Sequence, residues 1–165
     1  MPVRTPNTQE LLDATNMRLL RELAADARQS VSELARRAGV SAPTVRERLR
    51  RLEEGGVIRG YRVDIDAAAL GLPVAAWVRL RPGPGQMSRI AELAERSPEI
   101  SECHRISGED CYLIKVHVPD LGALEAILDR FLVHGQTTSS FVVSTPVPPR
   151  PVGLAGPGAV QKGDR

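Results

Sequence analysis

VSELARRAGVSAPTVRERLRRLEEGGVIRGY, residues 31 to 61, is the stretch that decides the fold of this chain. It predicts a short helix, a tight turn, a longer arginine-rich helix and a β-wing. Ser32 is expected to cap the first helix, and Gly39 stands where the turn favours a residue free to take a positive φ. Ser41 is expected to cap the second helix. Pro43 fits its first turn, because the N–H that proline lacks would have no partner there. The pattern predicts a helix-turn-helix.

The second helix is expected to have two different faces. Val45, Leu49 and Leu52 repeat at four- and three-residue spacing and predict a buried stripe. The polar residues lie away from that stripe, with Arg48 on its flank: Pro43, Thr44, Arg46, Glu47, Arg50 and Arg51. Arginine bonds guanine bidentately or grips phosphate, so this face suits the major groove of DNA. A merely solvated helix is the alternative, and it is disfavoured because the turn, the caps and the arginines agree.

Two flanking segments complete the predicted domain. A first helix is expected over about residues 11 to 27, and its leucines can pack on the two later helices: Leu12, Leu19, Leu20 and Leu23. Four residues after the arginine-rich helix suggest the strands of a wing: Val57, Ile58, Tyr61 and Val63. The resulting winged helix-turn-helix would span residues 11–63, after a flexible arm at 1–10.

Composition and charge narrow the class of protein. The chain has 165 residues, no apolar run of membrane-spanning length and no secretion signal, so a cytoplasmic protein is expected. Cys103 and Cys111 form no CxxC pair, which argues against a disulfide or a metal site. Residues 1–62 hold 12 basic and 8 acidic side chains, whereas residues 63–165 hold 10 and 12. Positive charge is therefore concentrated in the helix-turn-helix half, where DNA would lie.

The second half predicts an antiparallel sheet with two helices. Residues 64–73 have the composition of a hinge, and the domain is expected over 74–145. Its elements are strand 74–80, helix 86–96, strands 100–106 and 112–118, helix 121–133 and strand 137–143. This order is ferredoxin-like, with both helices on one face and Trp77 on the open one. Residues 146–165 are rich in proline and glycine and are expected to be disordered from about residue 151.

Few residues in the second half suggest chemistry by themselves. Ser107, Gly108, Glu109 and Asp110 form a polar turn between two strands, which the residues alone predict to be a plain hairpin. The three histidines, His104, His117 and His134, suit sheet positions and a helix end better than a metal or catalytic site. No catalytic triad, phosphate-binding loop or paired-carboxylate motif stands out.

Three segments together resemble one known family. The run from Leu12 and Asp13 through SELARRAGVSAPTVRERLRRLEEGGVIRGYRVDID closely resembles the winged helix-turn-helix of the Lrp/AsnC regulators. SGEDCYLIKV and TTSSFVVSTPVPPRPV resemble that family's effector domain. The resemblance implies an α+β protein, with an N-terminal winged helix-turn-helix followed by a ferredoxin-like β-α-β-β-α-β effector and dimerisation domain. Asn16 stands where the family usually carries aspartate.

The resemblance also implies a function, that of a sequence-specific DNA-binding transcriptional regulator. It would respond to a small metabolite, such as an amino acid, bound between C-terminal domains, and would need no other cofactor and no metal. The implied DNA-binding residues are Ser32, Ser41, Pro43, Thr44, Arg46, Glu47, Arg48, Arg50 and Arg51. Thr44, Arg46, Glu47 and Arg50 would face bases, and Ser32, Arg48 and Arg51 would face phosphates.

The effector would meet the polar turn and the last strand. The implied residues are Ser107, Gly108, Glu109, Asp110, Cys111, Gln136, Thr138, Ser139 and Ser140. Cys111 replaces the aspartate that usually precedes the tyrosine, while Glu109 and Asp110 offer carboxylates to an amino group. Expected partners are a pseudo-palindromic operator, the effector and further copies in a homodimer, tetramer or octamer. The alternative is an Lrp-like decarboxylase of tetrapyrrole metabolism, which would use histidine and arginine in a pocket between domains.

Overall fold

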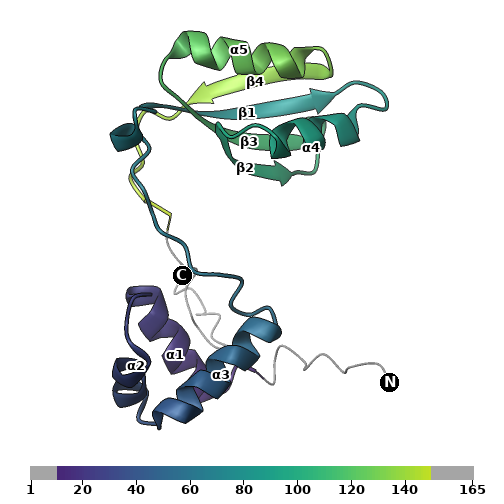
Figure 1. Cartoon of the computed structure of the whole chain (residues 1–165). Coiled ribbons are helices and arrows are strands. Elements are labelled where there is room, and N and C mark those ends of the chain that lie inside the picture. The colour runs from purple at the N-terminus through teal and green to yellow at the C-terminus, as the bar shows by residue number, and fades with distance from the viewer. Residues whose placement is uncertain (1–10, 150–165) are drawn as a thin grey trace, which may run out of the picture. The chain divides into compact units, whose positions relative to one another are not determined.

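The computed structural model describes residues 11–149, which fold into two compact units that divide between Val63 and Asp64. The first unit has three α-helices, and the second has a sheet with two α-helices; Figure 1 labels these elements. The expected arm at residues 1–10 and the expected disorder beyond residue 151 lie outside the described residues. No helix within residues 11–149 is long and apolar enough to cross a membrane.

The first unit consists of α1 (Ala14–Ala25), α2 (Val31–Ala38) and α3 (Ala42–Glu54). Helix α1 begins later than expected, because the side chain of Asp13 caps it by accepting the Asn16 backbone N–H at 2.7 Å. Leu19, Leu34 and Val45, one from each helix, are almost fully buried and form the centre of the core. The three-helix core is confirmed.

The predicted capping and turn residues are confirmed at two positions of three. Gly39 ends α2 at a φ of 71°, and the Ser41 side chain accepts the Thr44 N–H at 3.3 Å. The expectation for Ser32 is wrong, because Ser30 is the residue that caps α2 and accepts the Glu33 N–H at 3.1 Å. Only Ser30 has a glutamate three residues later, which is the capping-box spacing.

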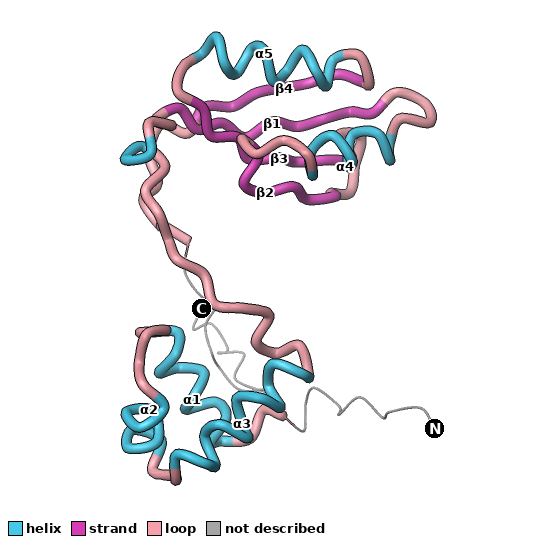
Figure 2. The backbone as a smooth tube through the Cα atoms, in the orientation of Figure 1, coloured by secondary structure: helices cyan, strands magenta, loops and turns pink. Residues whose placement is uncertain are grey.

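The strands expected in the wing are not formed. Residues 57–66 have no regular secondary structure, and Figure 2 shows them as loop. Tyr61, Val63 and Ile65 are 51%, 82% and 59% exposed. A strand needs hydrogen-bonding partners in a neighbouring strand. Among the described residues, only Val57 and Ile58 of this segment donate a backbone hydrogen bond to another backbone group, and both donate to Leu52 of α3.

The second unit has the expected element order. After a short 3-10 helix, η1 (Ala68–Leu70), come β1 (Val74–Pro82), α4 (Met87–Glu95), β2 (Ile100–Arg105), β3 (Tyr112–Val118), α5 (Leu121–Leu132) and β4 (Gly135–Phe141). The four antiparallel strands lie in the order β2-β3-β1-β4. Strand β3 has the predicted bounds, whereas β4 lies two residues earlier than expected. The ferredoxin-like arrangement is confirmed.

Both helices cover the same face of the sheet. Alternate residues of β1 and β3 are buried there against α4 and α5, with Ile90 and Phe131 fully enclosed. The other strand positions, including Trp77, lie on the opposite face, which neither α4 nor α5 covers. The uncovered face predicted from the sequence is therefore present.

Candidate functional site

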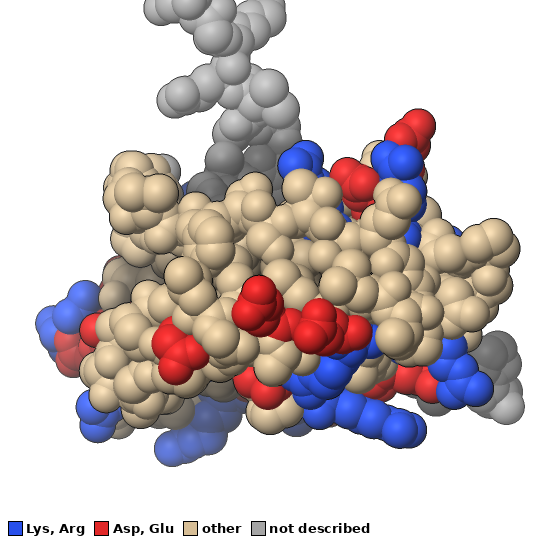
Figure 3. Space-filling view, turned by 90° about the horizontal axis from the view of Figure 1, so that it is seen from above, with Lys and Arg blue, Asp and Glu red and all other residues tan. Residues whose placement is uncertain are grey.

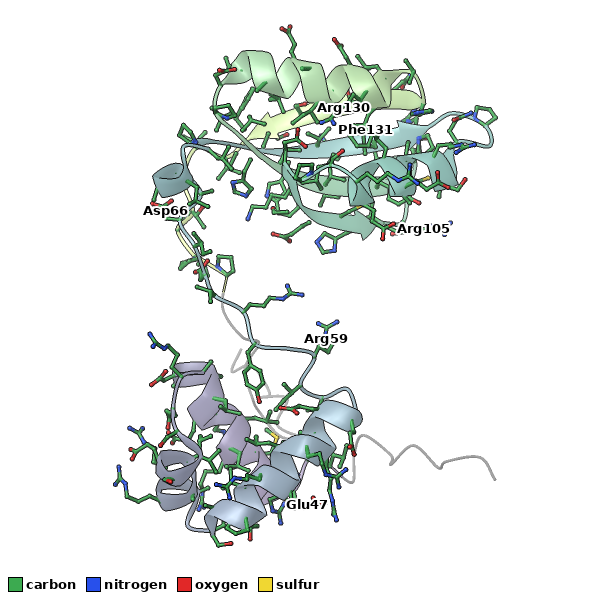
Figure 4. The ribbon with its side chains drawn as sticks, in the orientation of Figure 1. Glu47, Arg59, Asp66, Arg105, Arg130 and Phe131 are labelled. Carbon is green, nitrogen blue, oxygen red and sulfur yellow. The ribbon has the colours of Figure 1, made fainter. Side chains whose placement is uncertain are left out.

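The outer face of α3 presents the polar residues predicted to contact DNA. Arg46, Glu47, Arg50 and Arg51 are exposed, while Val45 and Leu52 are fully buried on the opposite side of the helix. Figure 4 shows Glu47 on the outer side of α3. Further residues predicted for this surface are exposed or half-buried: Ser32 on α2, and Ser41, Pro43 and Thr44 at the start of α3.

Glu47 is the centre of an ion-pair network on this face. Its carboxylate pairs with Arg50 at 2.8 Å and with Arg51 at 2.8 Å, and Arg50 also pairs with Glu54 at 2.6 Å. Hydrogen bonds from Arg50 and Arg51 lower the pKa of Glu47 to about 2. These pairs are exposed and are therefore weak, so a DNA phosphate can replace the glutamate at little cost.

Arg46 and Arg48 differ from the other arginines of α3. Arg46 forms no ion pair with any residue in the described range 11–149. The Arg48 guanidinium is half-buried and donates from Nη1 to Asp13 at 2.5 Å and to Asn16 at 2.9 Å. Asn16 is buried and donates in turn to the Leu11 carbonyl at 2.8 Å. Arg48 therefore joins α3 to the start of α1.

The turn predicted to contact an effector connects β2 to β3. Gly108 takes a φ of 105°, and the Ile106 N–H donates to the Cys111 carbonyl at 2.9 Å, which closes the turn. The acidic side chains are already paired. Arg81 bonds Glu109, and Arg79 and Arg81 lie 3.9 and 3.6 Å from the Asp110 carboxylate.

Strand β4 divides the polar residues predicted for the effector site. Gln136 pairs with Arg81, Thr138 with Arg79 and Ser140 with Trp77 across β1 and β4, so these three lie on the uncovered face. Ser139 pairs with Val78 and lies on the helix side, in a groove beside α5. Within residues 11–149 no hydrogen bond joins the turn to β4. Arg81 lies between the turn and β4, because it bonds Glu109 of the turn and stands opposite Gln136 of β4.

Arg79 and Arg81 are the residues that the sequence interpretation missed. They alternate with buried Val78 and Leu80 along β1, which places both on the uncovered face beside Trp77. This alternation of charged and apolar residues is visible in the sequence and could have placed both arginines on the uncovered face. The partner could not be found in the same way, because Asp110 lies 31 residues after Arg79 and only the β1 and β3 pairing brings them together.

The rest of the uncovered face carries a mixed polar cluster around Trp77. The Lys115 ammonium lies 5.6 Å from the centre of the Trp77 ring and pairs with Glu102 at 3.4 Å. His104 contacts both Trp77 and Glu102. Burial and the Lys115 charge lower the pKa of His117. No group of three or more potential metal ligands occurs among the residues that the structure describes.

The second half lacks a large patch of one sign on the face that Figure 3 presents. Most of the surface in that view is uncharged, with acidic side chains in small groups near its middle and basic side chains mainly along its edges. The net positive charge of the sequence lies instead in residues 1–62, with the arginines of α3. A capped helix with exposed arginines after a helix-turn defines the class of protein, a DNA-binding protein of the helix-turn-helix type.

Comparison with known proteins identifies the family. A winged helix-turn-helix DNA-binding model matches residues 12–59, and the Lrp/AsnC ligand-binding domain model matches residues 74–152. The chain belongs to the Lrp/AsnC family of DNA-binding transcriptional regulators. It is 38% identical to the HTH-type transcriptional regulator LrpA of Mycobacterium tuberculosis over 139 residues, which cover 82% of this chain and 93% of that protein.

Two solved structures are similar across both units of the chain. A feast or famine regulatory protein from M. tuberculosis, complexed with L-methionine, has a TM-score of 0.79 and 37% identity, and covers 85% of this chain and 97% of its own. A transcriptional regulator from Neisseria meningitidis, also in an L-Met complex, has a TM-score of 0.76 and 26% identity, with coverages of 82% and 92%. The relatives are regulators, so the prediction of a regulator and not an enzyme is confirmed.

Proposed function

We propose that this regulator binds a pseudo-palindromic operator as a homodimer and responds to an amino acid bound between its C-terminal units. The observation that carries the DNA part is the outer face of α3, where Arg46 is unpaired within the described chain and Arg50 is held only by exposed glutamates. Two half-sites require two copies of this face, and a two-fold dimer supplies them. Binding to chromosomal DNA requires the protein to lie in the compartment that holds that DNA, which we propose to be the cytoplasm.

Each arginine of α3 is given a role that follows from its contacts. Arg46 and Arg50, with Thr44 and Glu47, face base edges, and Arg51 and Ser32 face phosphates. Ser41 and Pro43 start the helix at the DNA surface. The Arg48 guanidinium already donates hydrogen bonds to Asp13 and Asn16. Its main role is therefore to orient α3 against α1, and any phosphate contact would add to these bonds.

The effector part rests on the turn from Ser107 to Cys111 and on β4. Arg79 and Arg81 neutralise Glu109 and Asp110, so the turn is not free to bind a ligand ammonium by simple charge attraction. A ligand with both an ammonium and a carboxylate can exchange with these pairs, one group for each sign. Two related structures are complexes with L-methionine, which favours an amino acid. Gln136, Thr138 and Ser140 would complete the site, and Ser139 would act from the helix side.

DNA binding is tested by fluorescence anisotropy with the promoter region of the chain's own gene at 100 mM and 200 mM salt. Arg46→Ala and Arg50→Ala are each expected to weaken specific binding by about 1–3 kcal/mol and to relax base preference. Arg89→Ala is the matched control, since Arg89 is an exposed, ion-paired helix arginine of the second unit. Wild-type binding by both α3 variants would overturn the assigned face.

The effector is tested by a thermal-shift screen against the twenty amino acids. A ligand that binds only the folded state raises the melting temperature, because it stabilises that state. At a ligand concentration of 100 times Kd, the stabilisation is about 2.7 kcal/mol. The amino acid that raises it should lose its effect in Thr138→Val, which keeps the volume but removes the hydroxyl. Ser88→Ala, at an exposed position on α4, is the control. An unchanged melting temperature with all twenty would contradict an amino-acid effector.

A further inference from the structure

The outermost polar side chain in the first half of α3 is acidic. Val45, Leu49 and Leu52 define the buried side of this helix. At 3.6 residues per turn, Glu47 lies almost directly opposite the middle of that stripe. Pro43 points in a similar direction, but its side chain has no hydrogen-bonding group. A helix that enters the major groove with this face therefore presents a carboxylate to the base edges.

The Glu47 carboxylate can only accept hydrogen bonds. Hydrogen bonds from Arg50 and Arg51 lower its pKa to about 2, so the group is ionised at neutral pH. Its Oε1 accepts from Arg50 Nη2 and Arg51 Nε, each at 2.8 Å, and its Oε2 accepts from Arg50 Nε at 3.1 Å. A carboxylate has about four acceptor positions. Within residues 11–149, Oε2 therefore keeps a position for one further donor.

The major-groove edges of the four bases differ in how well they suit such an acceptor. Guanine presents N7 and O6, and thymine presents O4, all of which are acceptors that repel a carboxylate. Adenine offers its N6 amino group, but with the N7 acceptor beside it. Cytosine offers the N4 amino group as its only polar group in this groove. The carboxylate of Glu47 therefore suits cytosine best.

We propose that Glu47 is a specificity-determining residue that accepts a hydrogen bond from the N4 amino group of one cytosine in each half-site. This inference rests on the proposed function, and it names the base that Glu47 selects. Arg50 and Arg51 hold the carboxylate in position and offset its repulsion by the phosphates. Any other base leaves the carboxylate without a good donor, and such a mismatch weakens binding about tenfold.

Glu54 is a matched comparison for Glu47. It also pairs with Arg50, at 2.6 Å, and it points in nearly the same direction from the helix axis. However, Glu54 is the last residue of α3, about 10 Å along the axis from Glu47, whereas recognition helices read bases with residues near their N-terminus. If Glu47 served only its arginines, as on any solvated helix, the two glutamates would be interchangeable. Base selection distinguishes them.

The base preference is tested by selection from duplexes of random sequence, with the full-length wild type, Glu47→Gln and Glu54→Gln chains in parallel. Wild type and Glu54→Gln are expected to enrich one sequence, with cytosine at a fixed position of each half-site. Glu47→Gln should prefer adenine there, because a carboxamide bonds adenine N6 and N7 bidentately. Both variants should bind unrelated duplexes roughly two- to fivefold more tightly than wild type, because each loses one negative charge.

A methyl group on N4 of the selected cytosine gives a second readout. In a base pair, guanine takes one N4 hydrogen and the other points into the major groove, where the methyl group replaces it. Fluorescence anisotropy should show that wild type and Glu54→Gln bind the methylated duplex about tenfold more weakly than the unmodified one. Glu47→Ala should bind the two duplexes equally. A circular dichroism melt of each variant shows whether the chain is folded.

Two results would overturn this role of Glu47 while leaving sequence-specific DNA binding intact. The first is an unchanged selected sequence in Glu47→Gln. The second is an equal effect of N4 methylation on wild type and Glu47→Ala. A wild-type chain that enriches no sequence at all would instead contradict the proposed function, and the assignment of Glu47 would fail with it.

Discussion

At the scale of single residues, Arg48 illustrates how a tertiary contact changes the role of a side chain. Its position on the flank of α3 suggested a phosphate contact. The structure gives its guanidinium two partners near the start of α1, Asp13 and Asn16. Those partners are 35 and 32 residues away in sequence, so no local pattern in α3 reveals them. The buried asparagine at 16 offers Arg48 an acceptor without placing a carboxylate in the interior.

Asp13 gives this contact a pH dependence. Burial alone would raise the pKa of Asp13, but hydrogen bonds from Arg48 and from the Asn16 backbone outweigh it and lower the pKa below 3.8. A folded-state pKa below the unfolded one means that the charged form stabilises the fold. That stabilisation is complete above the unfolded value, near pH 4, and is lost as pH falls through the folded pKa.

Asp13→Asn is expected to remove this pH dependence while keeping a side chain that can cap α1. The free energy of unfolding of the variant should be lower than that of wild type at pH 7 and pH 5. The difference should shrink as the pH falls from 5 through the unfolded-state pKa and then the lowered folded-state pKa of the Asp13 carboxyl, as that group becomes protonated. Urea denaturation at pH 7, 5, 3.5 and 2.5 measures it. A difference that stays constant down to pH 2.5 would show that the Asp13 charge does not stabilise the fold.

At the scale of helices and strands, the sequence predicted what periodicity determines and missed what pairing determines. The alternation in residues 112–118 gave β3 with its observed bounds, and the stripe of Val45 and Leu52 gave the buried face of α3. The wing was predicted from equally apolar residues, yet no strand forms because strand formation depends on a partner. The Ser32 cap failed for a local reason, since Ser30 has the capping-box spacing to Glu33.

Gly135 sets the start of β4 in a way that the sequence does not reveal. It pairs with Pro82 at the end of β1, and a Cβ at this position would lie 2.2 Å from the Arg81 carbonyl oxygen. Gly135→Ala must therefore push the two strands apart. It is expected to lower the free energy of unfolding by about 1–3 kcal/mol, as overpacking does elsewhere.

Gly122→Ala in α5 is the matched control for this substitution. Its added Cβ would lie 3.4 Å from Asp120, an ordinary contact, and alanine is the better helix former. The control should be neutral or stabilising by about 0.4–1 kcal/mol. Urea unfolding of both variants at pH 7 measures the difference. Equal effects would mean that the backbone at Gly135 relaxes and that β4 is not held by the close approach.

At the scale of the whole molecule, the two units carry separable chemistry. The first holds the exposed arginines of α3, and the second holds the paired charges around Arg79 and Arg81. The proposed response to an amino acid requires the two units to be coupled, and coupling is a free energy that acts in both directions. If an amino acid changes operator affinity by some factor, operator DNA must change the affinity for that amino acid by the same factor.

The coupling is therefore expected to be reciprocal in titrations of the amino acid found by the thermal-shift screen. The ratio of operator Kd values with and without the amino acid should equal the ratio of amino-acid Kd values with and without operator, in a range of about 5–150-fold. Anisotropy and calorimetry at one salt concentration measure the two ratios. The Arg46→Ala/Arg50→Ala chain is the control, because it should bind the amino acid with wild-type affinity and ignore added operator. An amino acid that binds tightly but leaves operator affinity unchanged would show that ligand binding does not regulate DNA binding. A ligand with equal affinity for two states does not shift the equilibrium between them.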